Sequence, residues 1–228
     1  MLLKTILNSI EKYKGFVYKD IKLVGEKSDL SLEVKIEPRR GSRGVCRGCG
    51  DLCSCYDTRG ERRYEYIPLW GMAVFFLYCP RRLNCPDCGI HVEQVPWAVG
   101  KNRLTQRYAW FLSCWAKRLS WKETAQAFGT SWHHVYSSVE MAVSWGLKHR
   151  TLEDIKSIGV DEIAWRKGHK YQTLVYQIDS HCKRLLWIGS ERTEKTLHGF
   201  FDELGTRRSG ELEYVCSFAV TCGKRILM

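Results

Sequence analysis

Two pairs of cysteines constrain the fold of this chain more than any other feature of its sequence. Cys46 and Cys49 lie in the segment CRGCG, and Cys85 and Cys88 lie in the segment CPDCG. Each pair has two intervening residues and a Gly or Pro that suits a tight turn, so together they predict one tetrahedral Zn²⁺ site made of four thiolates. Four sulfur ligands leave no open coordination position, which indicates a structural role for the zinc.

The 35 residues between the two pairs exceed the usual spacing of a zinc ribbon, and we attribute the excess to a hairpin that turns at Trp70 and Gly71. Cys53, Cys55 and Cys79 are close enough in sequence to serve as alternative ligands, and a set of reduced, unligated cysteines is the competing interpretation. A thioredoxin-like redox site is not favoured, because no βαβ pattern surrounds either pair. The absence of a signal-peptide pattern favours metal binding in a reducing bacterial cytoplasm over disulfides.

Positive charge is concentrated in the first two thirds of the chain. The net charge is +11; residues 1–150 carry 24 Lys and Arg against 14 Asp and Glu, whereas residues 151–228 carry 12 against 11. Such an asymmetry is typical of proteins that neutralise the phosphates of a nucleic acid. Because no apolar run approaches 18 residues, we expect no membrane partner.

The periodicity of apolar residues changes along the chain and predicts an α+β protein of several domains. Alternating residues near the N-terminus indicate strands, the cysteine-rich part indicates a zinc ribbon, and spacings of three and four residues indicate helices further on. The last part returns to strands with one helix, which begins at Thr193 and ends at Gly205. The predicted domains are an N-terminal helix and β-hairpin (1–37), a zinc ribbon (38–100), a helix-turn-helix unit (101–150) and a partial RNase-H-like α/β domain (151–228).

The segment WKETAQAFGTSWHHVYSSVE has the spacing of a helix-turn-helix. Ala125 permits close approach of two helices, Gly129 suits a turn with positive φ, and Val135 would fill their shared core. Ser131 is a natural N-cap for the second helix. An ordinary helical hairpin with solvated histidines is the alternative. We expect DNA contacts from Ser131 and from the residues that follow it, namely Trp132, His133, His134, Ser137 and Ser138.

The segment SIGVDEIAWRKGHKYQ places an acid, Asp161, on an apolar strand just before a basic cluster. A β-β-β-α-β order with an Asp on its first strand is how RNase-H-like nucleotidyl transferases begin, and their chemistry needs clustered carboxylates that hold two Mg²⁺ ions. A strand-end acid paired with a nearby Lys or Arg is the alternative, and Asp179 is a weaker catalytic candidate. The basic residues expected to follow the DNA backbone are Arg166, Lys167, His169 and Lys170.

Taken in order, these motifs resemble the DDE transposases of bacterial insertion sequences, specifically those of the IS-L-three type. The resemblance extends from about residue 30 to residue 217, and its most specific stretches are DEIAWRKGHKY and CPDCG. It implies an RNase-H-like fold, binding to the terminal inverted repeats of the element, and DNA strand transfer that depends on Mg²⁺. In this resemblance Asp161 matches the first catalytic acid of the family. Assembly into a homo-oligomer is left open.

The resemblance stops near the end of the chain. In the family the fourth strand delivers a second acid, but this chain reads VCSFAVTCGKRILM, with Phe218 at the position of that acid and no later third acid. We therefore expect a frameshifted or truncated copy that does not carry out strand transfer alone. We also expect residues 151–228 to expose apolar surface and to be less stable than residues 38–150.

Two other functions compete with this interpretation. The first is a transcriptional regulator with a zinc ribbon and a helix-turn-helix, whose C-terminal part senses a ligand or forms a dimer. This function does not explain the basic cluster that follows Asp161. The second is a metal-stabilised RNA-binding protein in which Trp97, Trp110 and Trp132 stack on bases.

Overall fold

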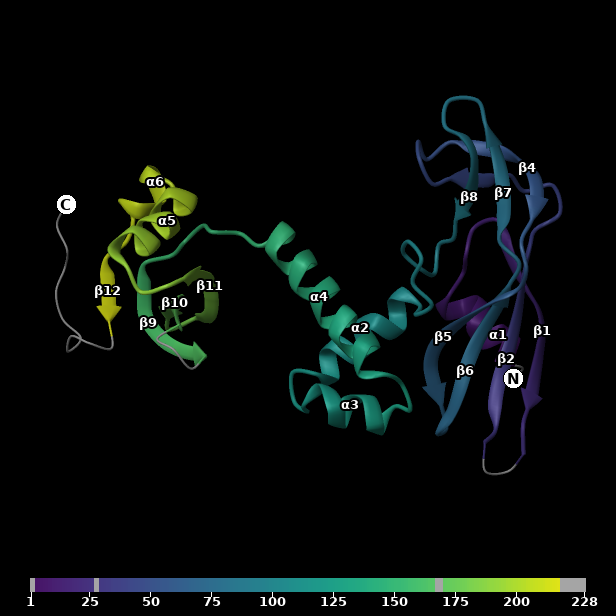
Figure 1. Ribbon diagram of the computed structural model, residues 1–228, viewed down its shortest axis with the longest axis horizontal. Coiled ribbons are helices and arrows are strands. Elements are labelled where there is room, and N and C mark those ends of the chain that lie inside the picture. The colour runs from purple at the N-terminus through teal and green to yellow at the C-terminus, as the bar shows by residue number, and fades with distance from the viewer. Residues whose placement is uncertain (1–2, 27–28, 167–169, 218–228) are drawn as a thin grey trace. The chain divides into compact units, whose positions relative to one another are not determined.

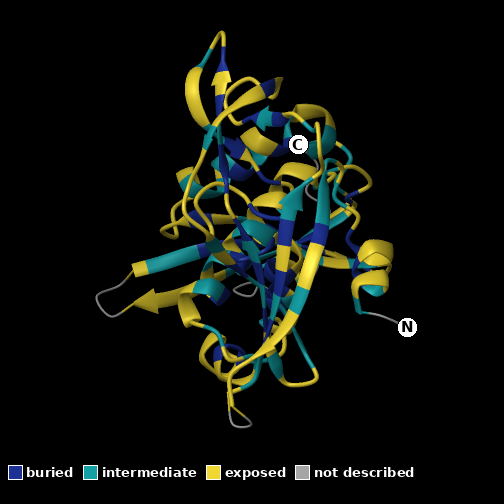
Figure 2. Ribbon diagram, turned by 90° about the vertical axis from the view of Figure 1, so that its right-hand side faces the viewer, coloured by how far each residue is buried: buried dark blue, intermediate teal, exposed yellow. Residues whose placement is uncertain are grey.

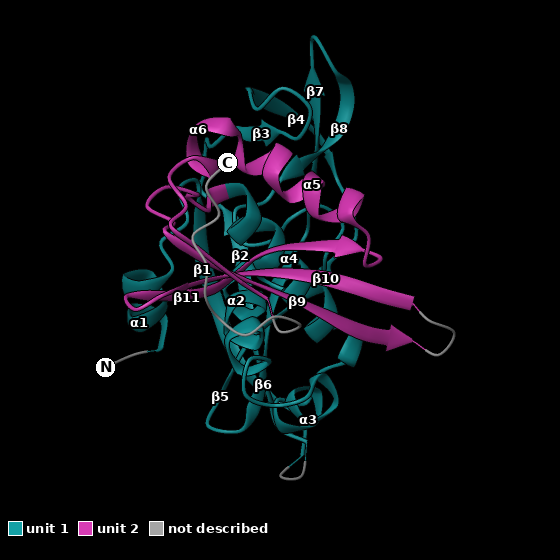
Figure 3. Ribbon diagram, turned by 90° about the vertical axis from the view of Figure 1, so that its left-hand side faces the viewer, with its two compact units in different colours: residues 1–148 teal, residues 149–228 magenta. Residues whose placement is uncertain are grey.

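The computed structural model describes residues 3–26, 29–166 and 170–217. The chain forms two compact units, Met1–Lys148 and His149–Met228, which are coloured separately in Figure 3. Buried and exposed positions alternate along many of the strands (Figure 2), as expected for sheets that cover a core with one face. No helix in the described part of the chain is both long and apolar enough to cross a membrane.

The first unit starts with a short helix and a four-stranded sheet (Figure 1). The strand order of the sheet is β1-β2-β6-β5. Strands β1 and β2 form an antiparallel hairpin, β5 and β6 form another, and β2 pairs with β6 in parallel. The bounds of these elements are α1 (Leu3–Ile10), β1 (Phe16–Val24), β2 (Ser31–Pro38), β5 (Arg62–Leu69) and β6 (Met72–Tyr78).

The second hairpin lies in a different place from the one that the sequence predicts. Its turn is formed by Trp70 and Gly71, both with positive φ, as expected. However, the sequence predicts that residues 62–78 belong to the zinc-ribbon segment 38–100, whereas the structure pairs them with the N-terminal hairpin of segment 1–37. The physical reason is that the two hairpins share one apolar core, at the centre of which the buried ring of Trp97 packs against four aromatic rings, those of Tyr13, Phe16, Tyr64 and Tyr78.

The cysteine pairs lie in a small closed barrel of four short strands. Its elements are β3 (Gly44–Cys46), β4 (Leu52–Thr58), β7 (Arg81–Cys85) and β8 (Gly89–Gln94). The barrel interior holds the fully buried Leu83 together with cysteine side chains. A buried ion pair joins the barrel to the end of β6: the Glu93 carboxylate lies 2.7 Å from an Arg81 guanidinium nitrogen and also accepts a hydrogen bond from Tyr78.

Three helices complete the first unit: α2 (Gln106–Trp115), α3 (Trp121–Ala127) and α4 (Trp132–His149). Thr105 caps α2, and Ser120 caps α3 through a capping box with Glu123. Gly129 has φ +62° between α3 and α4, and Ala125 and Val135 are buried in the shared helical core, all as predicted.

The second unit has one mixed sheet with the strand order β11-β10-β9-β12. Strand β9 is antiparallel to β10 and parallel to β12. The helices cover one side of this sheet (Figure 3), and their core includes Ile158, Val175 and Phe200. The elements are β9 (Ser157–Arg166), β10 (Lys170–Asp179), β11 (Cys182–Ser190), α5 (Glu194–Leu204), α6 (Thr206–Ser209) and β12 (Tyr214–Ser217).

Large apolar side chains remain exposed on the other side of this sheet. Ile178, Ile188 and Tyr214 are examples, and the strand register places them on the face opposite to the helices. This agrees with the prediction that residues 151–228 expose apolar surface. The predicted helix from Thr193 to Gly205 is also found, with the Thr193 hydroxyl accepting a hydrogen bond from the Thr196 backbone N–H.

Candidate metal centre and nucleic-acid interface

The sulfur atoms of the four cysteines in the two CxxC pairs converge on one point of the barrel. Each of the four residues offers a sulfur, and the four sulfurs lie within 4.8 Å of one another, with Cys49 and Cys85 at 3.5 Å. A tetrahedral ion with metal–sulfur bonds of about 2.3 Å needs sulfurs about 3.8 Å apart, so the group fits a metal ion of that kind. Among the described residues, these four cysteines form the one group of three or more Cys, His, Asp or Glu side chains that could hold a metal ion.

Backbone N–H groups of the turns favour the thiolate form that metal binding requires at two of the four cysteines, whereas the net effect of the surroundings, including burial, raises the pKa of Cys49 and Cys88. The backbone N–H groups of Cys49 and Gly48 lower the pKa of the Cys46 thiol. The backbone N–H of Cys88 lowers the pKa of Cys85 to about 7, against the effect of burial. Gly48 is required for a steric reason as well, since a Cβ at this position would lie only 2.8 Å from the Cys88 sulfur.

The other nearby cysteines do not join this group. Cys53 is buried beside it, but its sulfur donates a hydrogen bond to the Asp51 carbonyl, and burial raises its pKa to about 11. The Cys55 sulfur donates to the carbonyl of Asp57. Cys53 therefore acts as a core residue, and the two CxxC pairs alone supply the four converging sulfurs among the residues described.

The start of α4 presents several of the residues predicted to contact DNA. Ser131 precedes the helix, and its hydroxyl accepts a hydrogen bond from the His134 backbone N–H. Trp132 is 50% exposed, and its ring stacks on that of His133 at 4.5 Å. Ser137 is half-buried and donates to the His134 carbonyl. Ser131, Trp132 and His133 thus lie at an accessible helix start.

Two of the predicted contact residues point inward instead. The His134 ring lies 3.0 Å from the Thr130 hydroxyl and 3.4 Å from the carboxylate of Glu65 on β5. The hydrogen bond with Glu65 raises the pKa of His134, against the effect of burial. Ser138 is fully buried, because it lies three residues after the core residue Val135 and shares its helix face. The inward position of Ser138 corrects the expectation that it contacts DNA.

Sequence reasoning missed an aromatic cluster at the same helix start. Trp121 on α3 stacks against Trp132 with ring centroids 6.3 Å apart, and Tyr136 packs edge-on to both rings. All three rings are exposed. Their spacing in sequence, with two of them four residues apart on one predicted helix, was the available signal. The cluster makes the exposed end of the α3–α4 pair unusually apolar for a surface.

Asp161 lies in the middle of the mixed sheet, on the strand between β10 and β12. It pairs with Leu174 on β10, it is half-buried, and its carboxylate accepts a hydrogen bond from the Glu162 backbone N–H. The described pairing with β12 ends at Ser217 and Val160, one residue before Asp161. Phe218, the position of the expected second acid, lies outside the described residues.

Asp179, the weaker catalytic candidate, has a structural environment. It is buried, and its carboxylate accepts hydrogen bonds from the Gln177 side chain at 2.8 Å and from the Lys156 backbone at 3.2 Å. Burial acts to raise its pKa, but these hydrogen bonds lower it below the ordinary value. The residue therefore fixes the start of β9 against the end of β10.

The basic cluster after Asp161 is described only in part. Arg166 and Lys170 pair with each other at the ends of β9 and β10 and are both exposed, whereas Lys167 and His169 lie outside the described residues. Lys170 lines a cavity together with Arg192, whose guanidinium lies 4.1 Å above the Tyr171 ring. Arg192 is a further basic residue at this site that the sequence interpretation did not select.

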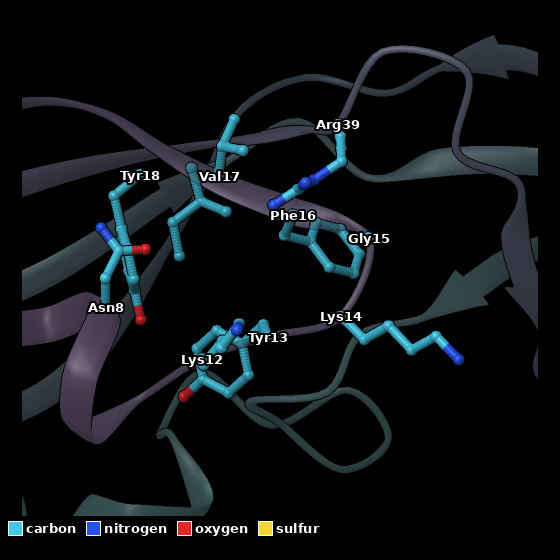
Figure 4. Close-up of a pocket in the computed structure, with 10 residues that line it drawn as sticks. Asn8, Lys12, Tyr13, Lys14, Gly15, Phe16, Val17, Tyr18 and Arg39 are labelled. Carbon is cyan, nitrogen blue, oxygen red and sulfur yellow. The ribbon is translucent and has the colours of Figure 1, made fainter.

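A cavity of about 610 Å³ lies beside α1 (Figure 4). Its lining includes Lys12, Lys14 and Arg39 around aromatic rings of β1 and the preceding loop. In Figure 4 the Lys14 ammonium points away from the other labelled side chains. The cavity therefore adds to the basic surface of this unit without gathering its cations at one point.

Comparisons with known proteins identify transposases as relatives of the chain. Residues 158–217 match the model of a family described as transposase, the DDE transposases of the ISL3 type. The chain is similar to the transposase for insertion sequence element IS1001 of Bordetella parapertussis, with 26% identity over 205 residues that cover 90% of this chain and 50% of that protein. It is also similar to the transposase for insertion sequence element IS1557 of Mycobacterium tuberculosis (strain CDC 1551 / Oshkosh), with 30% identity over 190 residues that cover 81% of this chain and 42% of that protein.

No solved structure matches the chain. The chain spans half or less of the length of the two curated relatives. The family match begins at Ile158 and includes Asp161, and both relatives also match far outside it, over most of this chain. The resemblance predicted from the motifs is thereby confirmed: residues 158–217 match the DDE transposases of the ISL3 type, and most of the chain is similar to transposases of bacterial insertion sequences.

Proposed function

We propose that this chain is the DNA-binding part of an insertion-sequence transposase, and that it recognises the terminal inverted repeats of its element. The observation that carries the proposal is the combination of two features in one unit: four converging cysteine sulfurs and a capped α3–α4 pair with an exposed helix start. The similarity to two transposases favours this function over that of a transcriptional regulator.

In this proposal the barrel holds a structural zinc ion through Cys46, Cys49, Cys85 and Cys88. The ion would supply folding free energy to four strands of three to seven residues, which are too short to form a large core of their own. The α3–α4 pair would act as a helix-turn-helix, with the start of α4 in the major groove. Trp132 and His133 would then contact base edges or the methyl groups of thymine.

The second unit would contribute an RNase-H-like sheet in which Asp161 is the first catalytic acid. Two-metal phosphoryl transfer needs several carboxylates that hold Mg²⁺ ions about 4 Å apart. Among the described residues, Asp161 lies in no cluster of three or more metal-binding groups. Strand transfer therefore requires acids in addition to Asp161, and we expect no strand transfer from residues 3–217 alone.

DNA binding is tested by selecting sequences from a random duplex library with the zinc-loaded full chain. The proposal expects enrichment of a defined motif, and the variant Trp132→Ala is expected to lose the enrichment. Trp145→Ala is a matched control, because Trp145 is an exposed tryptophan on the same helix but 13 residues further along. No enrichment by the wild type, or equal enrichment by both variants, would refute recognition through the start of α4.

A further inference from the structure

A basic cavity lies between the cysteine barrel and the sheet of the first unit. Its volume is about 420 Å³, and it is lined by the first cysteine turn, the β4–β5 connection, the start of β5 and the segment after β8. Four basic side chains lie on its wall, from three separate parts of the chain: Arg47, Arg59, Arg62 and Lys101.

Among the described residues, none of these four cations forms a salt bridge, although the charge of Arg59 lies near enough to Asp57 to help lower the pKa of its carboxyl. The carboxylate on the wall belongs to Glu93, whose side chain is 0% exposed and whose charge is compensated by Arg81 at 2.7 Å. Across the described residues, the salt bridges involve other basic groups than these four. The cavity therefore carries an excess of positive charge that suits an anionic ligand.

The structure holds two of these side chains in defined places. Arg47 lies between Cys46 and Cys49 in the metal-binding turn, and its guanidinium reaches the loop after β8, where a Cβ at Gly100 would lie 3.5 Å from its Nη2 atom. Arg62 and Tyr64 line the same cavity; burial raises the pKa of Tyr64, and the charge of Arg62 and its hydrogen bond to the phenol oppose this rise. A cavity lined by several guanidinium groups is suited to phosphate groups, because guanidinium groups form paired hydrogen bonds with phosphate oxygens.

We propose that this cavity holds phosphate groups of the DNA backbone, so that the contact with DNA extends beyond the α3–α4 pair to the metal-binding barrel. The inference rests on the proposed DNA-binding function. Double-stranded DNA is the partner because the exposed start of α4 suits the major groove of B-form DNA, whereas the major groove of duplex RNA is too deep and narrow for side chains to read.

The test is the salt dependence of duplex DNA binding by the zinc-loaded full chain, followed by fluorescence anisotropy of a labelled duplex. The variant Arg47→Gln/Arg62→Gln/Lys101→Gln removes three cavity cations. Each lost phosphate contact lowers the slope of log affinity against log salt by about 0.9, so the triple variant is expected to lose between two and three from the slope. Its affinity at 0.15 M salt is expected to fall by at least tenfold.

The matched control is Arg63→Gln, which removes the same charge from the neighbouring residue of β5. Arg63 points away from the cavity, with its guanidinium 3.9 Å above the Phe75 ring and 3.4 Å from Glu33. The slope of log affinity against log salt for Arg63→Gln is expected to equal that of the wild type. The single variants Arg62→Gln and Lys101→Gln, which lie outside the cysteine turns, are each expected to lose about one from the slope while retaining the wild-type zinc content.

The possible results separate this inference from the proposed function. If the wild type binds duplex DNA and the cavity variants keep its slope, the cavity is not a phosphate site although the chain binds DNA. If the zinc-loaded wild type binds no duplex even at low salt, both proposals fail. Tighter binding to a duplex RNA of equal length, lost in the triple variant, would overturn the assignment to DNA.

Discussion

The buried ion pair between Arg81 and Glu93 gives the sharpest prediction for stability. The Glu93 side chain is 0% exposed and that of Arg81 is 7% exposed. The carboxylate accepts hydrogen bonds from the Arg81 side chain at 2.9 and 2.7 Å, from the Arg81 backbone N–H at 2.8 Å, and from the Tyr78 hydroxyl. The pair joins two strands of the barrel to the end of β6 in the neighbouring sheet.

The variant Glu93→Gln keeps the shape of the side chain but leaves the Arg81 charge buried without a counter-charge. Removing one partner of a buried pair costs about 3–5 kcal/mol, because the remaining charge keeps its desolvation penalty. The neighbouring pair, Arg82 with Asp57, is the matched control, since both of its side chains are 40% exposed. Asp57→Asn is expected to leave the stability close to that of the wild type, because solvent screens an exposed pair.

The assay is urea unfolding of the zinc-loaded full chain, followed by far-UV circular dichroism and tryptophan fluorescence, with the zinc content of each variant measured. Fluorescence reports mainly on the first unit, because seven of the nine tryptophans lie within residues 1–148, among them Trp97, which packs against Tyr78. The prediction is a much lower free energy of unfolding for Glu93→Gln and almost no change for Asp57→Asn. Equal losses in the two variants would refute the argument that burial decides the contribution of each pair.

Three further predictions follow from single contacts. Gly129→Ala should destabilise the helical part by about 1–2 kcal/mol in urea unfolding, because φ +62° is unfavourable for a residue with a Cβ while no atom lies within 4 Å to cause a clash; an unchanged midpoint would contradict this. The His134–Glu65 contact should contribute its full stability from about pH 6.5 down to about pH 4.5, and this stability should be lost as pH rises through the raised pKa of His134. The unfolding midpoint of the wild type should therefore fall more between pH 6.5 and 8.5 than that of His134→Gln. Parallel curves for the two proteins would count against the contact. Limited proteolysis of the full chain should cleave within residues 149–217 before it cleaves within residues 38–148, since the sheet of the second unit has an exposed apolar face; equal resistance of the two units would contradict this.

Local features of the fold were predictable from the sequence because they depend on neighbouring residues. The turn at Trp70 and Gly71, the positive φ of Gly129 and the helix start at Thr193 follow from turn and capping preferences. The convergence of the four cysteines was also predictable, because a metal site requires four ligands and the two CxxC spacings supply them.

Features that depend on distant pairing were not predictable in the same way. The periodicity of residues 62–78 indicates a hairpin, but it does not say which sheet the hairpin joins, and β6 pairs in parallel with β2 across more than 30 residues of sequence. The inward side of α4 was also hard to assign, because His134 is polar and half-buried, and it contacts Glu65 on a strand that is distant in sequence. The neighbouring residues Arg81 and Arg82 likewise pair with different acids, Glu93 and Asp57, because each acid comes from a different strand of the barrel.

The central claim is that a metal ion held by the two CxxC pairs organises a DNA-binding unit. The most direct test is a chelator titration of the full chain in which bound zinc and the affinity for a labelled duplex are measured in the same samples. The account predicts one zinc per chain and a loss of DNA binding in proportion to the zinc removed, with recovery when zinc is restored. Undiminished DNA binding by the metal-free chain, or a purified chain that binds DNA while retaining no metal at Cys46, Cys49, Cys85 and Cys88, would contradict it.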